Sequence, residues 1–173
     1  MPRSFDMATD YGGTVEQVHR ALADERYWLV RLQDSGADHA TLDELTVDAD
    51  GGIRVRTTQT LRADRLPGVV TQFHRGDLSF VREEIWTPIS NRRSGATVRG
   101  SIPGAPASLS GDATLSSVAD DLGALVSRLA LKATVEVRVP LVGGKIENFI
   151  GSQLVELMVA EQRFTTEWIA ENG

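Results

Sequence analysis

The chain has 173 residues, a net charge of −6 at pH 7 and a hydrophobic fraction of 41%. We expect a single domain over residues 1–173, because this length suits one core and the composition is that of a folded protein. The chain contains no cysteine, which excludes disulfides, thiolate catalysis and cysteine metal sites. The acidic balance disfavours nucleic acid as a partner, because phosphate binding requires clustered Lys and Arg.

Membrane and metal signals are also missing from the sequence. No apolar run approaches the roughly 20 residues of a membrane-spanning helix, and the first residues carry no apolar stretch of the secretory type. We therefore expect a cytoplasmic protein without integral membrane association. The three histidines (His19, His39 and His74) are not spaced as metal ligands, and there is no phosphate-binding loop or nucleophile elbow. The sequence thus predicts no metal and no cofactor.

The N-terminal part predicts one strand followed by two short helices. Alternation of apolar and polar residues over residues 3–10 is typical of a half-buried strand. Thr14 lies three residues before Gln17, which is the spacing of a capping box, so a helix is expected to begin there. A second helical segment is expected over residues 25–33.

From residue 40 onward the apolar pattern has a period of two, which predicts a run of antiparallel strands. The clearest alternation covers residues 53–62, where Val55 and Gln59 share one face with other apolar and small polar residues and the arginines occupy the other. The expected strands cover residues 40–49, 53–62, 69–74, 78–87, 96–102, 109–118 and 124–139, with the Gly- and Ser-rich residues 100–111 as a wide loop.

The C-terminal part predicts one long helix, from residue 145 to about residue 171, with Gly151 as its only weak position. At 1.5 Å per residue this helix is about 40 Å long, so it must lie across most of the sheet. Segregated helices and strands favour the α+β class. The expected architecture is a curved antiparallel sheet wrapped around the long helix, with two short helices after the first strand.

Two stretches of the C-terminal part resemble a known family. Residues 135–150, VEVRVPLVGGKIENFI, and residues 161–168, EQRFTTEW, resemble the last strand and helix of the branch called domain of unknown function 2505. By element order the whole chain is similar to the helix-grip fold of the START and birch-pollen-allergen superfamily, which includes lipid-transfer domains and polyketide cyclases. The resemblance implies a hydrophobic cavity under the terminal helix and a small apolar or amphipathic ligand. It brings no catalytic residue.

The long helix carries an apolar stripe that we expect to face the sheet. Five side chains fall within about 40° of one direction at 100° per residue: Ile146, Ile150, Leu157, Phe164 and Trp168. Gln153 and Glu161 lie inside or beside the same stripe. A buried carboxylate is costly unless it is paired or protonated. Glu161 is therefore either a polar group inside a ligand cavity or one half of a structural pair with an arginine.

The strand that contains Phe80 has two possible inward faces. One face carries Phe80 and Trp86 together with Arg82 and Glu84. We expect this aromatic face to point inward, which would place Arg82 and Glu84 inside the fold and within reach of Glu161. A β-bulge would invert the assignment.

These features favour the binding of a small hydrophobic or amphipathic ligand, such as a lipid or a polyketide, for transport or sequestration. The expected site is a cavity between the sheet and the C-terminal helix. The side chains expected to line this cavity are Phe5, Gln59, Phe80, Arg82, Trp86, Gln153, Leu157, Glu161 and Phe164.

Two alternatives to a ligand-binding protein stay open. One is an enzyme of the cyclase, dehydratase or hydrolase type that uses Glu161 with Arg82 or His74 for proton transfer. The other is a protein-interaction module without a ligand. The outer side of the long helix is expected to carry three apolar side chains that would suit a homodimer: Val155, Val159 and Ile169.

Overall fold

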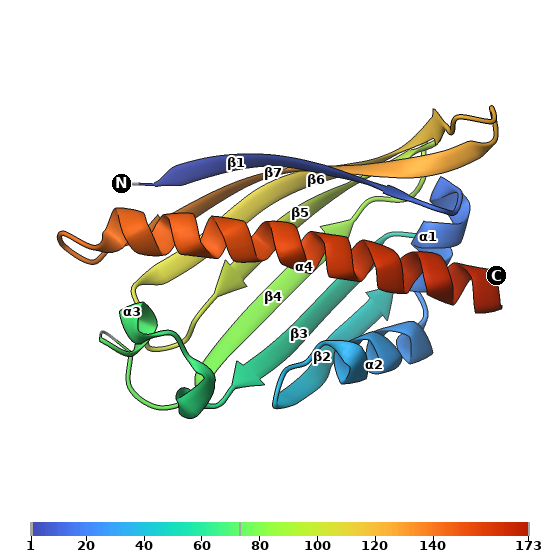
Figure 1. Cartoon of the computed structure of the whole chain (residues 1–173). Coiled ribbons are helices and arrows are strands. Elements are labelled where there is room, and N and C mark those ends of the chain that lie inside the picture. The colour runs from blue at the N-terminus through green and yellow to red at the C-terminus, as the bar shows by residue number, and fades with distance from the viewer. Residues whose placement is uncertain (1, 73, 173) are drawn as a thin grey trace.

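The computed structural model describes residues 2–72 and 74–172 (Figure 1). Its N-terminal elements are β1 (Arg3–Tyr11), α1 (Val15–Leu22), α2 (Glu25–Asp34), β2 (His39–Val47), β3 (Ile53–Leu61), the 3-10 turn η1 (Ala63–Arg65) and α3 (Gly68–Thr71). The remaining elements are β4 (Leu78–Trp86), β5 (Arg93–Ser101), β6 (Ala107–Ala119), β7 (Leu125–Val137) and α4 (Gly143–Asn172).

The strands form one antiparallel sheet in the order β1-β7-β6-β5-β4-β3-β2. The sheet curves around α4, which lies across its concave face, while α1 and α2 lie at one end (Figure 1). The expected α+β architecture, with two short helices after the first strand and one long helix at the end, is confirmed.

Local sequence signals specify where the first two helices begin. Thr14 Oγ1 accepts a hydrogen bond from the Gln17 N–H at 3.2 Å, and Gln17 Oε1 accepts one from the Thr14 N–H at 2.9 Å, which completes the predicted capping box. Asp24 caps α2 by accepting a hydrogen bond from the Arg26 N–H. Both helix starts are thus fixed by residues that lie close together in the chain.

The segment between β3 and β4 differs from the prediction. Residues 69–74 were expected to form a strand, but the first of them belong to the short helix α3, in which the N–H groups of Val70 and Thr71 donate to the carbonyl of Pro67. Phe73 lies outside the described residues. The strand prediction is wrong because an apolar run this short has no period that separates a strand from a helical turn.

The hairpin between β4 and β5 is tighter than predicted. Asn91 and Arg92 adopt positive φ angles of 53° and 60°, so the chain reverses over these two residues. As a result β5 begins at Arg93 rather than at residue 96. At the other end of β5, the expected wide loop of residues 100–111 covers only residues 102–106, because β6 already begins at Ala107.

Alternation along β3 and β4 shows which face of the sheet points inward. On β3, Val55 is 1% exposed while Arg54 is exposed. On β4, Trp86 is buried, and the side chains of Arg82 and Glu84 are only 11% and 12% exposed. The aromatic face of β4 therefore points inward, as predicted, and it carries an arginine and a glutamate with it.

Two hydrophobic cores lie between the sheet and the helices. The C-terminal core lies beneath the last turns of α4 and is centred on Tyr27, Trp28 and Trp168, whose rings meet edge to face at centroid distances of 5.4 and 5.7 Å. The N-terminal core lies beneath the first turns of α4 and contains Val135 and Ile146. The turns of α4 between these cores remain available for other contacts.

The buried face of α4 overlaps the predicted stripe but is centred to one side of it. Ile146 and Trp168 of the stripe are buried, and so are Glu147, Gly151, Met158 and Thr165 outside it, so the centre of the buried face is rotated by roughly 70° from the stripe. Gln153 was expected inside the fold, but the rotation leaves it exposed.

The rotation of α4 follows from its close approach to β1. A Cβ atom on Gly151 would lie 2.2 Å from the ring of Phe5, so only a glycine allows this packing. Phe5 was expected to line a ligand cavity, but its ring packs against the backbone of α4 instead. Ile169 was expected on the outer side of the helix, but it is 7% exposed and lies against Gly13.

We predict that Gly151→Ala destabilises the protein by about 1–3 kcal/mol, because the added methyl group overlaps the ring of Phe5. In a helix without this contact the same change stabilises by up to about 1 kcal/mol. Gly144→Ala is the matched control in α4, since its Cβ would meet only the flexible end of Arg3, at 3.4 Å. Urea unfolding should show opposite signs for the two variants, and an equal effect would contradict the packing described here.

Candidate functional site

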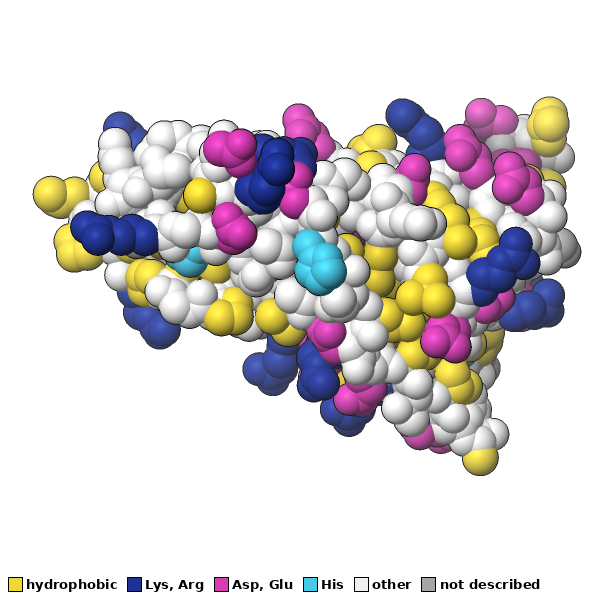
Figure 2. All heavy atoms as spheres, turned by 90° about the horizontal axis from the view of Figure 1, so that it is seen from below, with side chains coloured by type: hydrophobic (Ala, Val, Ile, Leu, Met, Phe, Trp, Pro, Cys, Tyr) yellow, Lys and Arg dark blue, Asp and Glu magenta, His cyan; other side chains and the backbone are white. Residues whose placement is uncertain are grey.

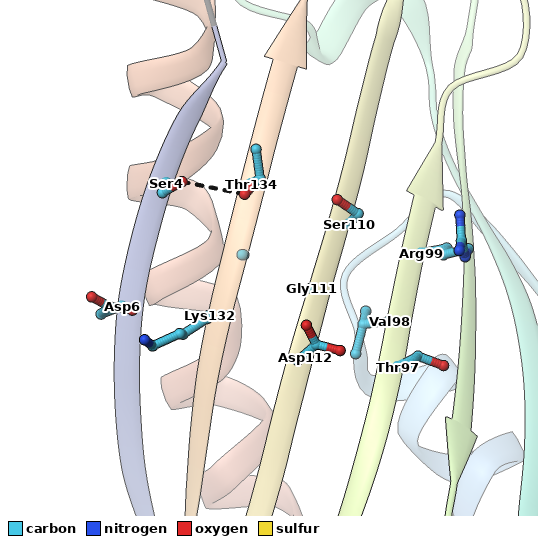
Figure 3. Close-up of a pocket in the computed structure, with 11 residues that line it drawn as sticks. Ser4, Asp6, Thr97, Val98, Arg99, Ser110, Gly111, Asp112, Lys132 and Thr134 are labelled. Carbon is cyan, nitrogen blue, oxygen red and sulfur yellow. Dashed lines mark hydrogen bonds between the residues drawn. The ribbon is translucent and has the colours of Figure 1, made fainter.

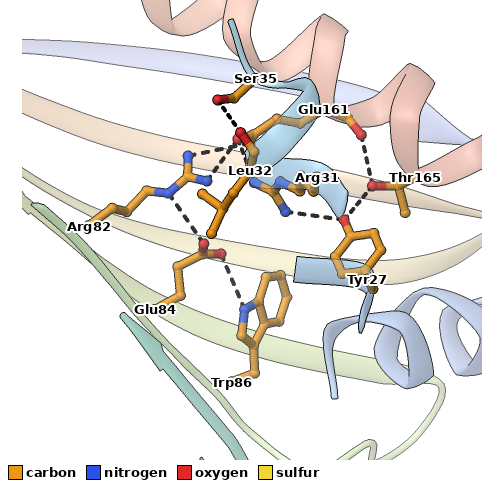
Figure 4. Close-up of polar contacts among 9 residues, drawn as sticks. All are labelled: Tyr27, Arg31, Leu32, Ser35, Arg82, Glu84, Trp86, Glu161 and Thr165. Carbon is orange, nitrogen blue, oxygen red and sulfur yellow. Dashed lines mark hydrogen bonds and ion pairs between the residues drawn. The ribbon is translucent and has the colours of Figure 1, made fainter. Parts of the chain in front are cut away.

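Four charged side chains meet between the sheet and α4 (Figure 4), and we call them the charge cluster: Arg31, Arg82, Glu84 and Glu161. Arg31 comes from α2, Arg82 and Glu84 from β4, and Glu161 from α4. Each of the four side chains is at most 22% exposed. Three elements that are distant in the sequence thus bring their charges to one place.

Glu161 is the centre of the charge cluster. Its Oε2 atom lies 2.5 Å from Arg31 Nη2 and 2.7 Å from Arg82 Nη2, and its Oε1 atom lies 3.4 Å from Arg82 Nη1. On the other side of Arg82, its Nε atom lies 3.4 Å from Glu84 Oε2. Trp86 Nε1 donates a hydrogen bond to Glu84 Oε1 at 3.3 Å. The charges therefore alternate in sign from α2 through α4 to β4.

A chain of hydrogen bonds holds Arg31 in place. Arg31 Nη1 donates to the hydroxyl of Tyr27 at 3.1 Å, and Thr165 Oγ1 donates to the backbone carbonyl of Glu161 at 2.7 Å. The Tyr27 hydroxyl has one proton, which it donates to Thr165 Oγ1 at 2.6 Å. The guanidinium of Arg31 also lies over the ring of Trp28, 4.5 Å from its centroid.

The charge cluster is fully ionised at its centre. Burial alone would raise the pKa of Glu161, but the charges of Arg31 and Arg82 outweigh it and lower this pKa to about 2. Burial alone would lower the pKa of both arginines, but the charge of Glu161 outweighs it and raises each pKa above its usual value. Glu161 is therefore a carboxylate that balances two guanidinium groups.

Half-buried side chains flank the charge cluster. Leu157 lies one helical turn before the cluster on α4, and Phe80 lies next to it on the inner face of β4. The ring of Phe80 packs on Gly100, where a Cβ atom would lie 2.6 Å from it. Gln59 lies opposite Phe80 on β3. An apolar surface with one amide thus adjoins the charged groups.

The structure places some of the predicted site residues together and others apart. Those in or beside the charge cluster are Gln59, Phe80, Arg82, Trp86, Leu157 and Glu161. Phe164 belongs to the C-terminal core, 5.7 Å from the ring of Tyr27. Phe5 packs on Gly151, and Gln153 is exposed, so neither lies at the charge cluster.

Two buried charges were not among the predicted site residues. Arg31 lies four residues after Tyr27 and three after Trp28, which puts it on the buried face of α2, and this spacing could have identified it. Glu147, which the predicted stripe placed on the outer side of α4, is 0% exposed and accepts a hydrogen bond from the N–H of Val137. Its burial follows from the rotation of α4.

The expected cavity between the sheet and α4 is not confirmed. A hollow of about 440 Å³ lies on the outer face of the sheet over β1, β7, β6 and β5 (Figure 3). Another, of about 60 Å³, lies between α1 and the end of α4. The outer hollow is lined mainly by hydroxyl and charged side chains, among them Asp6, Arg99, Asp112 and Lys132. Neither hollow contains a residue predicted for the ligand site.

Residues 2–72 and 74–172 contain neither a metal site nor a helix that could span a membrane. Within them, no three His, Asp or Glu side chains come together as a metal site. None of the helices described there is long and apolar enough to cross a membrane. His74, the histidine considered for proton transfer, lies with its Nε2 atom 3.1 Å from the carbonyl oxygen of Asp77, apart from the charge cluster.

The curved sheet gripping α4 is the helix-grip fold, and solved structures share it. Ara h 8.0201 is 12% identical, with a TM-score of 0.55 over 99% of this chain and 100% of that one. The Zhui aromatase/cyclase from Streptomyces sp. R1128 is 12% identical, with a TM-score of 0.57 over 98% and 94%. The TTHA0849 protein of Thermus thermophilus is 16% identical, with a TM-score of 0.55 over 99% and 100%. At these identities the likeness shows the fold alone.

Sequence comparison gives the family within this fold. The model described as "Protein of unknown function (DUF2505)" matches residues 6–169, and the chain belongs to this family. The uncharacterized protein Rv0481c of Mycobacterium tuberculosis (strain ATCC 25618 / H37Rv) is 49% identical over 176 residues, which cover 99% of each chain. The uncharacterized protein Mb0491c of Mycobacterium bovis (strain ATCC BAA-935 / AF2122/97) matches to the same extent.

Proposed function

We propose that the protein binds a small amphipathic ligand on the concave face of the sheet, between the two hydrophobic cores. The polar end of the ligand lies at the charge cluster, and its apolar part lies against Phe80 and Leu157. The observation that carries this proposal is the convergence of four charged side chains, each at most 22% exposed, from three elements.

Stability alone does not account for the charge cluster. Replacing a buried ion cluster by hydrophobic residues of similar volume is often neutral, or stabilising by about 1–4 kcal/mol, because desolvation of the charges offsets their attraction. Ionisable groups with perturbed pKa values also gather at functional sites. A polar group with hydrogen-bonding capacity beside an apolar surface is the usual composition of a ligand site.

The fold is consistent with a ligand of this kind. One protein of the same fold is named an aromatase/cyclase, which makes an aromatic or polyketide-like molecule a reasonable ligand class for this chain. We place a lipid or a polyketide first, held for transport or sequestration in the cytoplasm.

Binding is favoured over proton-transfer catalysis by the state of Glu161. Because its pKa is lowered to about 2, this carboxyl group carries no proton to donate near neutral pH. Glu161 is also a weak base, because two arginines stabilise its negative charge. His74 contacts Asp77 instead of the charge cluster, so it does not supply the second group that an acid–base pair needs.

The test removes the charges without creating an unpaired one. In the variant Arg31→Met, Arg82→Met, Glu84→Gln, Glu161→Leu, the charge cluster becomes uncharged at similar volume. We expect this variant to unfold at the same temperature as the wild type or higher. Native mass spectrometry of both proteins, purified from a mycobacterial host because the relatives are mycobacterial, should show a bound small molecule on the wild type alone.

Organic extraction should release this molecule from the wild type and identify it. The matched control is the variant Asp6→Ala, Lys132→Ala, which changes the outer hollow and should keep the bound molecule. An adduct on the four-residue variant equal to that on the wild type would contradict the proposal. A wild type without any adduct from this host would contradict it as well.

A further inference from the structure

The charge cluster also restricts the charge of the ligand, and this restriction rests on the proposed function. The cluster contains two guanidinium groups and two carboxylates. Arg31 is paired with Glu161, and Arg82 is paired with both Glu161 and Glu84. Each positive group therefore already has a negative partner, and the net charge of the cluster is zero.

A charged ligand would upset this balance. A carboxylate placed among these side chains would add an excess negative charge, and an ammonium group would add an excess positive one. An uncompensated charge away from water is strongly unfavourable. A fatty acid, which needs an arginine without a partner for its carboxylate, finds both arginines of the cluster already paired.

The charge cluster nevertheless retains capacity for neutral polar groups. An arginine has five N–H donors, and the Nε–H of Arg82 has no hydrogen bond of good geometry. This Nε–H is covered by protein, so a ligand reaches it only when the side chain of Arg82 shifts. The carboxylate of Glu161, whose side chain is 22% exposed, has lone pairs beyond those that its two arginines occupy. A ligand carbonyl can accept from Arg82, and a ligand hydroxyl can donate to Glu161.

The side chains around the charge cluster do not add an excess of positive or negative charge. Viewed from below, acidic and basic side chains are interspersed over most of that face, with hydrophobic side chains in several places between them (Figure 2). Phe80, Leu157 and Gln59, the half-buried side chains beside the cluster, are uncharged. A ligand therefore meets an apolar surface and one charge-balanced polar group.

We infer that the ligand is uncharged: an apolar or aromatic body that carries a hydroxyl or carbonyl group and contacts Arg82 and Glu161 through it. The class is that of neutral lipids, such as long-chain alcohols and ketones, and of phenolic or polyketide-like molecules. Free fatty acids and amines are outside this class.

Three naphthalene probes of similar shape test the inference at pH 7: 2-naphthol, which is neutral, 2-naphthoate, which is anionic, and 2-naphthylmethylammonium, which is cationic. Affinities are measured by calorimetry, and the site is located by NMR shifts of residues around Phe80 and Arg82. We expect 2-naphthol to bind at least about ten-fold more tightly than either charged probe, because neither charged probe finds an unpaired partner.

The variant Glu84→Gln is expected to weaken this preference in a controlled way. The amide has the shape of the carboxylate and can still accept from Trp86 Nε1, but the charge cluster becomes net positive. We expect the affinity for 2-naphthoate to increase about ten-fold relative to the affinity for 2-naphthol. Equal or tighter binding of 2-naphthoate by the wild type would overturn the neutral class and leave the proposed site standing. If none of the probes shifts residues around Phe80 and Arg82, the proposed function fails, and the inference fails with it.

Discussion

Glu161→Ala is expected to lower the free energy of unfolding by about 3–5 kcal/mol, because it leaves two arginines without their shared partner. The side chains of Arg31 and Arg82 are only 10% and 11% exposed, so water cannot replace the lost carboxylate without rearrangement. Urea denaturation at pH 7 measures this loss. In a chain of this size the melting temperature should fall by roughly 6–20 °C.

Two comparisons make this prediction specific. Glu156→Ala removes an exposed carboxylate from the same helix and should change the stability by no more than about 0.5 kcal/mol. The four-residue uncharged variant also lacks Glu161 but leaves no arginine unpaired in the cluster, so it should be more stable than Glu161→Ala. A loss below about 1 kcal/mol in Glu161→Ala would mean that both arginines find other partners, contrary to the contacts described above.

The second large effect is a loss of stability in acid. The pKa of Glu161 is about 2 in the folded protein, below its usual value of 4.5. Ionised Glu161 therefore stabilises the fold fully above about pH 4.5, and this contribution disappears as the pH falls toward 2. The shift corresponds to about 3 kcal/mol, of which about 2 kcal/mol should be lost between pH 7 and pH 3.

The variant Glu161→Gln separates this effect from other carboxyl groups. Asp10 and Asp38 also have a pKa that hydrogen bonding holds below its usual value, through Arg128 for Asp10 and chiefly through the Arg62 backbone N–H for Asp38, so the whole protein loses stability in acid. Urea unfolding of both proteins at pH 7 and pH 3 should show about 2 kcal/mol less acid loss in the variant. If the wild type and the variant lose the same free energy of unfolding between pH 7 and pH 3, the lowered pKa belongs to another group and the prediction is wrong.

The strands of the sheet could be predicted because their pattern is local. Alternation fixed the inner face of β3 from neighbouring residues alone. On β4 alternation left two possible faces, and the aromatic side chains of Phe80 and Trp86 indicated the inner one, and with it the position of Arg82 on the side of α4. The sequence therefore predicted that Arg82 lies close to Glu161. It could not decide whether the two residues belong to a ligand site or form a purely structural pair. The helix α3 was misjudged because four residues contain too little periodicity.

The orientation of α4 could not be predicted, because it depends on contacts between opposite ends of the chain, among them that of Phe5 with Gly151. Phe5 and Gly151 meet only after β1 has joined the sheet and α4 has crossed it, and no pattern within the helix reports this contact. The resulting rotation exposes Gln153 and buries Glu147. In the same way, Arg31 could be assigned to the buried face of α2, but its pairing with Glu161 depends on how α2 packs against α4.

The central claim is that the ligand contacts the charge cluster on the concave face of the sheet. A crystal structure of the protein with 2-naphthol tests this claim most directly. We predict the hydroxyl group of the probe within hydrogen-bonding distance, about 3.2 Å or less, of Arg82 or Glu161, with its rings against Phe80 and Leu157. A probe bound instead in the hollow of about 440 Å³ on the outer face, with the concave face unoccupied, would contradict it.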